Sequence, residues 1–217
     1  MSSLRSISLA VALVCCSSVA HAGIIFDNGV TLFNSWIVSD NSPGAEQLVA
    51  DDFILKAGAS HVTGVQWSGV YARGSIPVDN FNILIHADVQ GAPDTAAVYT
   101  FTNLNVTRTL FAGNPTGTEF TYVAEIDVQL LPEVPYWISI YEQLPTDLRW
   151  AQVFQFGGNL FYRRTLSDPY GLSIPYRTDF QLLGNDPEPV PEPATFALLS
   201  LGLAGVGYHR RRKRVQT

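Results

Sequence analysis

The chain has 217 residues, of which 47% are hydrophobic and 15% charged, and its formal net charge at pH 7 is −6. Residues 23–189 carry seven cations against eighteen carboxylates. This acidic balance excludes nucleic acid as an expected partner, because phosphate binding depends on Lys and Arg. The only two cysteines are Cys15 and Cys16, so thiol catalysis and disulfides are excluded from the chain beyond them.

Residues 1–22 have the three parts of a secretory signal peptide. Arg5 supplies the positive start, Ile7–Val14 the apolar run, and Ala20-His21-Ala22 a small-x-small cleavage site before Gly23. The pattern predicts export through the Sec translocon and cleavage by signal peptidase after Ala22. A lipoprotein signal is the alternative, although neither cysteine after the apolar run is preceded by the small residue that such a signal uses.

Residues 23–184 alternate apolar and polar side chains, a period typical of strands. The clearest strands are Val62–Tyr71, Phe81–Val89, Thr121–Leu130, Tyr136–Glu142, Arg149–Phe156, Asn159–Arg163 and Thr178–Leu183. Gly- and Pro-rich turns separate them, and no window keeps a helical period for three turns. About ten short strands at this spacing predict an all-β domain, a two-sheet β-sandwich with jelly-roll-like connectivity.

The chain then changes character. Residues 185–193 form a proline-rich linker, residues 194–208 are uncharged and apolar, and residues 209–217 are basic. Fifteen helical residues span ~22 Å, less than the ~30 Å bilayer core, so the run alone is more typical of a buried core helix. Its flanks favour a transmembrane helix instead, because cations hold the following tail in the cytoplasm. These cations are Arg210, Arg211, Arg212, Lys213 and Arg214.

The order of tripeptide, helix and basic stop resembles the PEP-CTERM sorting signal of Gram-negative bacteria. Pro191, Glu192 and Pro193 match the recognition tripeptide of that family, and the apolar helix and terminal arginines follow in the same order. The resemblance implies that the chain is a substrate of exosortase, an integral-membrane transpeptidase. It also implies an inner-membrane precursor that later reaches the cell surface or the exterior.

The body of the chain is similar, more loosely, to a class of PEP-CTERM proteins to which no activity is assigned. The phrases that carry this similarity are Val49–Phe53, Gly64–Tyr71, Asp79–Ile83 and Asp179–Gly184. The similarity implies an exported sandwich domain and nothing about its chemistry.

Four aspartates form the candidate metal site. Asp51, Asp52, Asp79 and Asp88 offer the hard oxygen ligands that Ca²⁺ prefers. Adjacent residues of a strand point to opposite faces, however, so Asp51 and Asp52 meet one ion only where the chain bends. The alternative is that these carboxylates are structural or solvated, with no cofactor.

Polar and aromatic residues form a candidate carbohydrate site. Asn82 and His86 share the polar face of one strand, and Trp137 is out of phase with its apolar neighbours, so it is the best candidate to stack on a sugar. The alternatives are a solvated face and a core tryptophan. Glu125 and Asp127 share a strand face, where two carboxylates could act as the acid and base of a glycosidase. Their alternative is simple exposure to water.

The sorting signal and the lack of a recognisable catalytic motif favour a non-catalytic protein of the cell surface or exopolysaccharide matrix. A carbohydrate-binding module, assisted by Ca²⁺ or not, is the second hypothesis, and a polysaccharide hydrolase is the third.

Overall fold

The computed structural model describes residues 23–29, 35–44, 46–71, 78–111, 119–143, 150–171 and 173–185. The predicted signal peptide (1–22), linker residues 186–193, the predicted helix (194–208) and the basic tail (209–217) lie outside these ranges. Within them, no helix is long and apolar enough to span a bilayer. The strands are β1 (Gly23–Asp27), β2 (Trp36–Val38), β3 (Leu48–Ile54), β4 (His61–Tyr71), β5 (Phe81–Val89), β6 (Ala92–Leu104), β7 (Val106–Leu110), β8 (Glu119–Gln129), β9 (Pro135–Glu142), β10 (Trp150–Arg163), β11 (Ser173–Thr178) and β12 (Phe180–Gly184).

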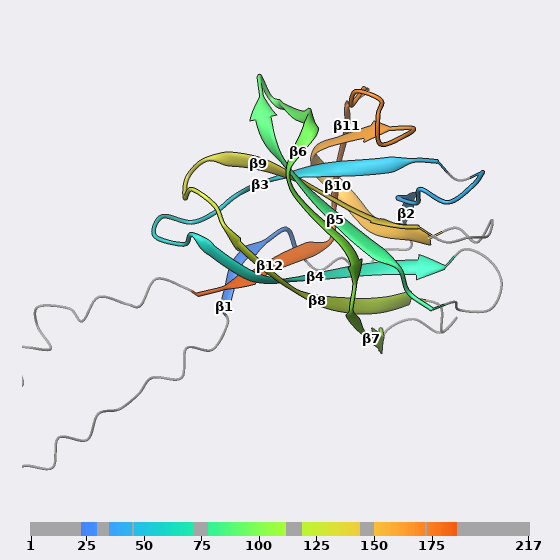
Figure 1. Ribbon diagram of the computed structural model, residues 1–217, viewed down its shortest axis with the longest axis horizontal. Coiled ribbons are helices and arrows are strands. Elements are labelled where there is room, and N and C mark those ends of the chain that lie inside the picture. The colour runs from blue at the N-terminus through green and yellow to red at the C-terminus, as the bar shows by residue number, and fades with distance from the viewer. Residues whose placement is uncertain are drawn as a thin grey trace, which may run out of the picture.

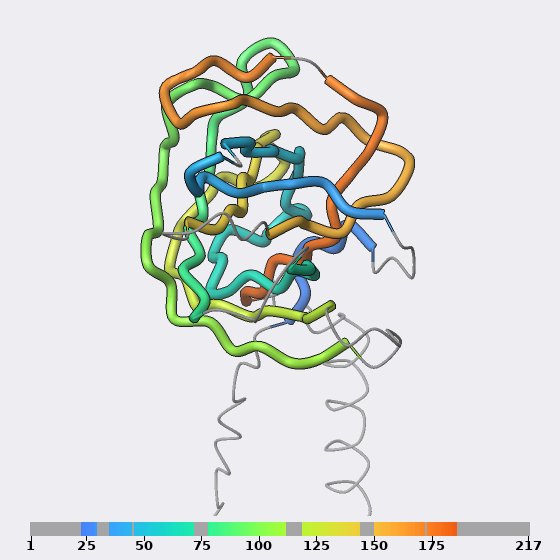
Figure 2. Tube along the Cα trace, turned by 90° about the vertical axis from the view of Figure 1, so that its right-hand side faces the viewer, coloured from blue at the N-terminus to red at the C-terminus, as the bar shows by residue number. Residues whose placement is uncertain are grey.

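The strands form one large antiparallel sheet, in the order β1-β12-β4-β10-β3-β9-β5-β6 (Figure 1). β8 continues from β4 to β7, and β2 and β11 both pair with β10. β10 connects two parts of the sheet, because its residues Trp150–Gln152 pair with β4 and its residues Leu160–Arg163 pair with β3. Figure 2 shows β6 along one flank of the molecule and β7 with β8 at its base. The all-β prediction is confirmed, and the jelly-roll sandwich stays a prediction.

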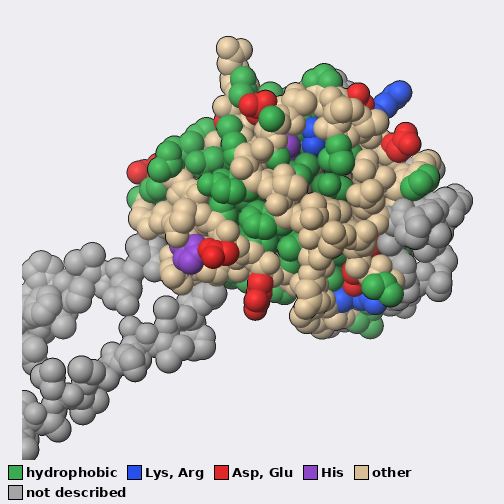
Figure 3. Space-filling view, in the orientation of Figure 1, with side chains coloured by type: hydrophobic (Ala, Val, Ile, Leu, Met, Phe, Trp, Pro, Cys, Tyr) green, Lys and Arg blue, Asp and Glu red, His purple; other side chains and the backbone are tan. Residues whose placement is uncertain are grey.

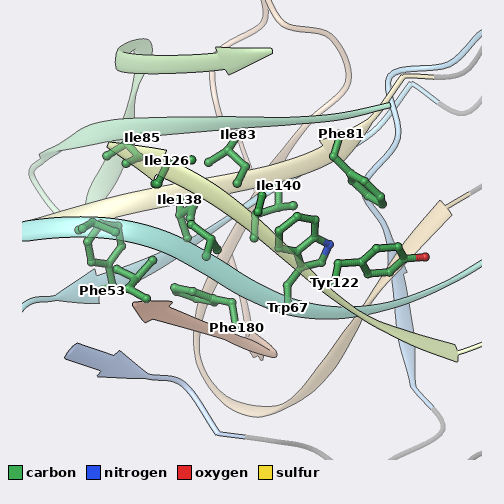
Figure 4. Close-up of a cluster of buried hydrophobic side chains, with 14 of the residues drawn as sticks. Phe53, Trp67, Phe81, Ile83, Ile85, Tyr122, Ile126, Ile138, Ile140 and Phe180 are labelled. Carbon is green, nitrogen blue, oxygen red and sulfur yellow. The ribbon is translucent and has the colours of Figure 1, made fainter. Parts of the chain in front are cut away.

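The core lies between two groups of strands that are connected through β10: β4, β8 and β12 form one group, and β3, β5 and β9 form the other. Side chains from β4, β8 and β12 point toward side chains from β3, β5 and β9 (Figure 4), and together they form one buried cluster. The ring centroid of Trp67 is 5.2 Å from that of Phe81, which is 4.9 Å from that of Trp150. All three rings are at most 1% exposed. Packing of such large rings supplies much of the stability that this disulfide-free domain needs.

Strand burial follows the predicted alternation in β8 and departs from it in β5. In β8, Tyr122 and Ala124 are buried while Glu125 and Asp127 are exposed, as a one-sided strand requires. In β5 both faces are buried, and the polar residues Asn82 and His86 are only 3% and 0% exposed. The expectation that these two residues lie on a solvated face is wrong, because Tyr170 after β10 contacts His86 and the end of β6 contacts Asn82.

Two predicted boundaries are corrected. The sequence predicts a turn at Gly157-Gly158, but β10 continues through both glycines, whose φ values are +99° and +119°. The pairing with β11 shifts there, so the glycines form a bulge rather than a turn. The single predicted strand Thr178–Leu183 is in fact two elements, because the chain leaves β11 at Thr178 and enters β12 at Phe180 to pair with a different neighbour.

Gly69 in β4 tests how tightly the core is packed. A Cβ atom at this position would overlap the Trp150 indole, which is fully buried. Gly69→Ala is therefore expected to lower the free energy of unfolding by roughly 1–3 kcal/mol, the usual cost of overpacking. Urea denaturation measures this, with Gly171→Ala as the control, since a Cβ there would lie 3.8 Å from the Tyr162 oxygen. Equal midpoints for the two variants would contradict the close contact.

Candidate functional site

The two ends of the described domain meet at one place. β1 begins at Gly23, the residue after the predicted cleavage site, and Gly23 pairs with Gly184 at the end of β12. The two strands lie side by side in Figure 1. The predicted signal peptide and the linker therefore attach to the same end of the domain.

Asp51, the first of the predicted calcium ligands, ties three strands together. Its Oδ2 atom accepts hydrogen bonds from Asn28 Nδ2 at 2.8 Å, from the Thr178 amide at 2.5 Å and from Thr178 Oγ1 at 2.9 Å. The side chain is 1% exposed. Burial raises the pKa of this carboxyl to about 7, against the lowering effect of the Thr178 hydrogen bonds. Its surroundings are those of a structural carboxyl group.

The other three aspartates do not converge on Asp51. Burial raises the pKa of Asp52, with a further contribution from the charge of Asp88. Asp88 accepts the indole N–H of Trp137 at 2.8 Å. Asp79 binds Tyr71 and Arg108 instead, at 2.6 and 2.8 Å. Among the described residues, no group of three or more His, Cys, Asp or Glu side chains could hold a metal ion.

The predicted carbohydrate residues share one face of the sheet, on which His86 and Trp137 are covered. Trp137 is 3% exposed and packs edge-on against Phe161, with ring centroids 5.1 Å apart. His86 Nε2 lies 3.2 Å from the Tyr170 hydroxyl, and burial, followed by the charge of Arg163, lowers the pKa of His86 to about 4. Trp137 thus presents no open ring to a sugar, a correction that follows from the segment folded over this face.

Asn82 is the predicted carbohydrate residue that reaches a groove. It lines a space of about 490 Å³ over β5, β6 and β9. Its Oδ1 atom accepts the amide N–H of Asn103 at 3.1 Å, which fixes the end of β6. Asn82 therefore shapes one wall of the groove.

Glu125 and Asp127, the predicted acid–base pair, line a second open groove of about 740 Å³, together with Phe101 and Leu183. Asp127 Oδ1 lies 2.7 Å from His61 Nε2, and the Asp127 side chain is 88% exposed. The general acid of a glycosidase normally lies buried in an apolar site. A carboxylate this exposed lacks that environment.

A buried acidic network was not foreseen from the sequence. The Tyr71 hydroxyl lies 2.6 Å from both Asp79 Oδ1 and Glu142 Oε1. Glu142 is fully buried, and this burial raises its pKa to about 8, with smaller contributions from the charges of Asp79 and Asp40. Burial also raises the pKa of Tyr71. Glu142 is in phase with Ile138 and Ile140 on a buried face of β9, so the alternation of this strand was the signal that could have indicated its burial.

Arg163 was also missed, although cations are scarce in this domain. It ends β10, is 3% exposed, and lines the groove that Asn82 reaches. Its guanidinium carbon lies 4.4 Å from the centroid of the Tyr170 ring. The adjacent Arg164 is exposed. Two consecutive arginines at a strand end are typical of solvated cations, so the sequence did not indicate that Arg163 is buried.

Comparison with known proteins identifies a family motif in the C-terminal segment of the chain. Residues 189–213 match the family model described as the PEP-CTERM protein-sorting motif. The match covers the predicted tripeptide, the apolar helix and the basic stop as far as Lys213, and it does not extend into the β-strand domain. No curated protein matches the chain. The chain is a protein that carries a PEP-CTERM sorting motif at residues 189–213, as its sequence predicts.

Proposed function

We propose that this chain is an exported, non-catalytic protein of the cell surface or exopolysaccharide matrix, sorted by an exosortase. The observation that carries the proposal is the match of residues 189–213 to the PEP-CTERM sorting motif. This motif implies processing by exosortase, and with it export and a membrane-anchored precursor in a Gram-negative bacterium. The predicted signal peptide at residues 1–22 would supply the export step.

The position of the domain ends supports a defined orientation at the membrane. Gly23 and Gly184 are paired neighbours, so the signal peptide and the sorting helix would approach the bilayer from one end of the domain. Nine linker residues, 185–193, reach at most ~28 Å when extended as polyproline. The end formed by β1 and β12 would therefore face the membrane, and the tripeptide would meet exosortase close beneath it.

A structural role of the domain is supported by the use of its buried carboxylates. Asp51 of β3, which is buried, accepts a hydrogen bond from Thr178 of β11. Asp79, which is half-buried just before β5, accepts one from Arg108 of β7. Glu125 and Asp127 are exposed on β8. The two groups of strands that enclose one aromatic core favour a β-sandwich as the architecture, and we propose jelly-roll-like connectivity for it. Such a domain suits a surface or matrix component that must stay folded without disulfides.

The sorting step is tested by changing the tripeptide. Replacing Pro191, Glu192 and Pro193 with alanine should leave full-length precursor in the inner membrane, because exosortase would lose its recognition element. The chain offers a matched control in its second Pro-Glu-Pro, Pro187-Glu188-Pro189. Alanines there should leave processing unchanged. Immunoblots of membrane and extracellular fractions measure the processing of both variants. If the variant at residues 191–193 is processed as fully as the control, exosortase sorting through these residues is refuted.

A further inference from the structure

Arg163 is a buried cation that has no charged partner among the residues that the structure describes. Its Nη1 atom donates to the backbone oxygen of Thr95 at 3.2 Å, and its guanidinium stacks on Tyr170. Within the described part of the chain, no carboxylate forms an ion pair with it and nothing accepts a hydrogen bond from its Nε atom. Burying a guanidinium costs free energy unless an anion compensates its charge. The site therefore has an unused capacity for one negative group.

The groove beside Arg163 has walls of mixed chemistry. Thr100, Thr102 and Asn103 of β6 line it, as does Gln143 after β9, and these four residues are exposed. Leu84 and Leu166 add apolar surface. Hydroxyl and amide side chains both donate and accept hydrogen bonds, as sugar hydroxyls do. Apolar patches suit the C–H faces of a sugar ring.

The size and charge of the groove distinguish between anions. A space of about 490 Å³ is much larger than one phosphate needs, and a phosphate would favour a wall of donors over the mixed wall seen here. The single buried cation matches a single carboxylate, which Arg binds through two parallel hydrogen bonds. On the face drawn in Figure 3, Lys and Arg atoms form only small separate areas, so a continuous polyanion would find little further attraction.

We propose that this groove binds an acidic sugar unit of a polysaccharide, with the guanidinium of Arg163 receiving the carboxylate of a uronic acid and the β6 side chains contacting its hydroxyls. The ligand chemistry is a chain in which uronic acids are spaced by neutral sugars. The inference relies on the proposed function only for where the protein would meet such a chain.

Binding can be measured by calorimetry with the full-length protein in detergent. The probes are hyaluronan oligosaccharides, in which glucuronate alternates with a neutral sugar, and the same oligosaccharides with their carboxylates reduced to alcohols. We expect the acidic form to bind and the reduced form to bind at least about tenfold more weakly, as loss of a charge-assisted hydrogen bond predicts. Equal affinity for both forms, or no binding of the acidic form, would overturn the proposal.

Two variants locate the site. Arg163→Gln should weaken binding of the acidic oligosaccharide at least about tenfold. Thr100→Glu, at an exposed position that does not threaten the fold, should do the same by placing a negative charge in the groove. The matched control is Thr109→Glu on β7, which adds the same charge at an exposed position that does not line the groove. If Thr100→Glu binds as well as Thr109→Glu does, the groove is not the site.

Competition separates a sugar site from a site for any small anion. Free glucuronate should displace the oligosaccharide at much lower concentration than acetate or phosphate. Equal competition by all three would show an anion site without sugar recognition and would refute the polysaccharide ligand. Failure of these binding tests leaves the processing of the tail unaffected, and failure of exosortase processing leaves the binding intact, so the two proposals fail separately.

Discussion

Replacing Asp51 with alanine is expected to lower the free energy of unfolding by roughly 3–5 kcal/mol, because each buried polar group left without a partner costs about 1–3 kcal/mol. The change would leave the Asn28 amide, the Thr178 N–H and the Thr178 hydroxyl without the acceptor that they share. These donors lie where β1, β3 and β11 meet, so the loss affects three strands at once. Chemical denaturation monitored by tryptophan fluorescence measures the effect.

Two further variants separate the lost hydrogen bonds from the lost charge. Asp51→Asn keeps an oxygen for the donors at Oδ2 and disturbs only the Asp52 amide at Oδ1, so it should cost clearly less than alanine. Asp127→Ala removes an exposed carboxylate and should change stability by less than about 1 kcal/mol. An Asp51→Ala protein as stable as Asp127→Ala would disprove the structural role of Asp51.

The domain is expected to lose stability as the pH rises from 6.5 to 8.5. Burial raises the folded-state pKa of Asp51 from 3.8 to about 7 and that of Glu142 from 4.5 to about 8. Between the unfolded and folded pKa values, the folded state holds a proton that the unfolded state has released. Stability therefore falls with rising pH, by up to about 1.4 kcal/mol per pH unit for each group. Over this window the expected loss is roughly 2–3 kcal/mol.

The range from pH 6.5 to 8.5 lies mostly above the range in which His86 has the opposite effect on stability. The pKa of His86 falls from 6.5 to about 4 on burial, so protonation of the unfolded state costs stability as the pH drops below 6.5. Urea midpoints at pH 6.5, 7.5 and 8.5 measure mainly the carboxyl contribution, because unfolded His86 is only half protonated at pH 6.5 and loses that proton by pH 7.5. Glu142→Gln should flatten most of the slope, because folded Glu142 keeps its proton up to about pH 8, whereas Asp51 releases its proton near pH 7. A midpoint that rises with pH in the parent protein would contradict the assignment.

The sorting signal in the tail could be predicted because it consists of short segments that follow one another in the sequence. Pro191-Glu192-Pro193, an apolar run and a basic stop act as a linear signal, so no tertiary contact is needed to read them. The strands were predictable for a related reason, since a strand with one buried face, such as β8, shows its alternation directly in the sequence.

Which strand faces are buried by other segments of the chain could be learned only from the folded structure. Alternation placed Asn82 and His86 on a polar face of β5, but His86 is buried beneath Tyr170, and Asn82 is buried beside Asn103 of β6. The same side of the sheet buries Trp137 against Phe161 and holds Arg163 beside a groove whose described lining residues include no carboxylate. Alternation records which side chains point together. It does not record which distant segment of chain lies above them, because that contact joins residues whose separation leaves no periodic trace.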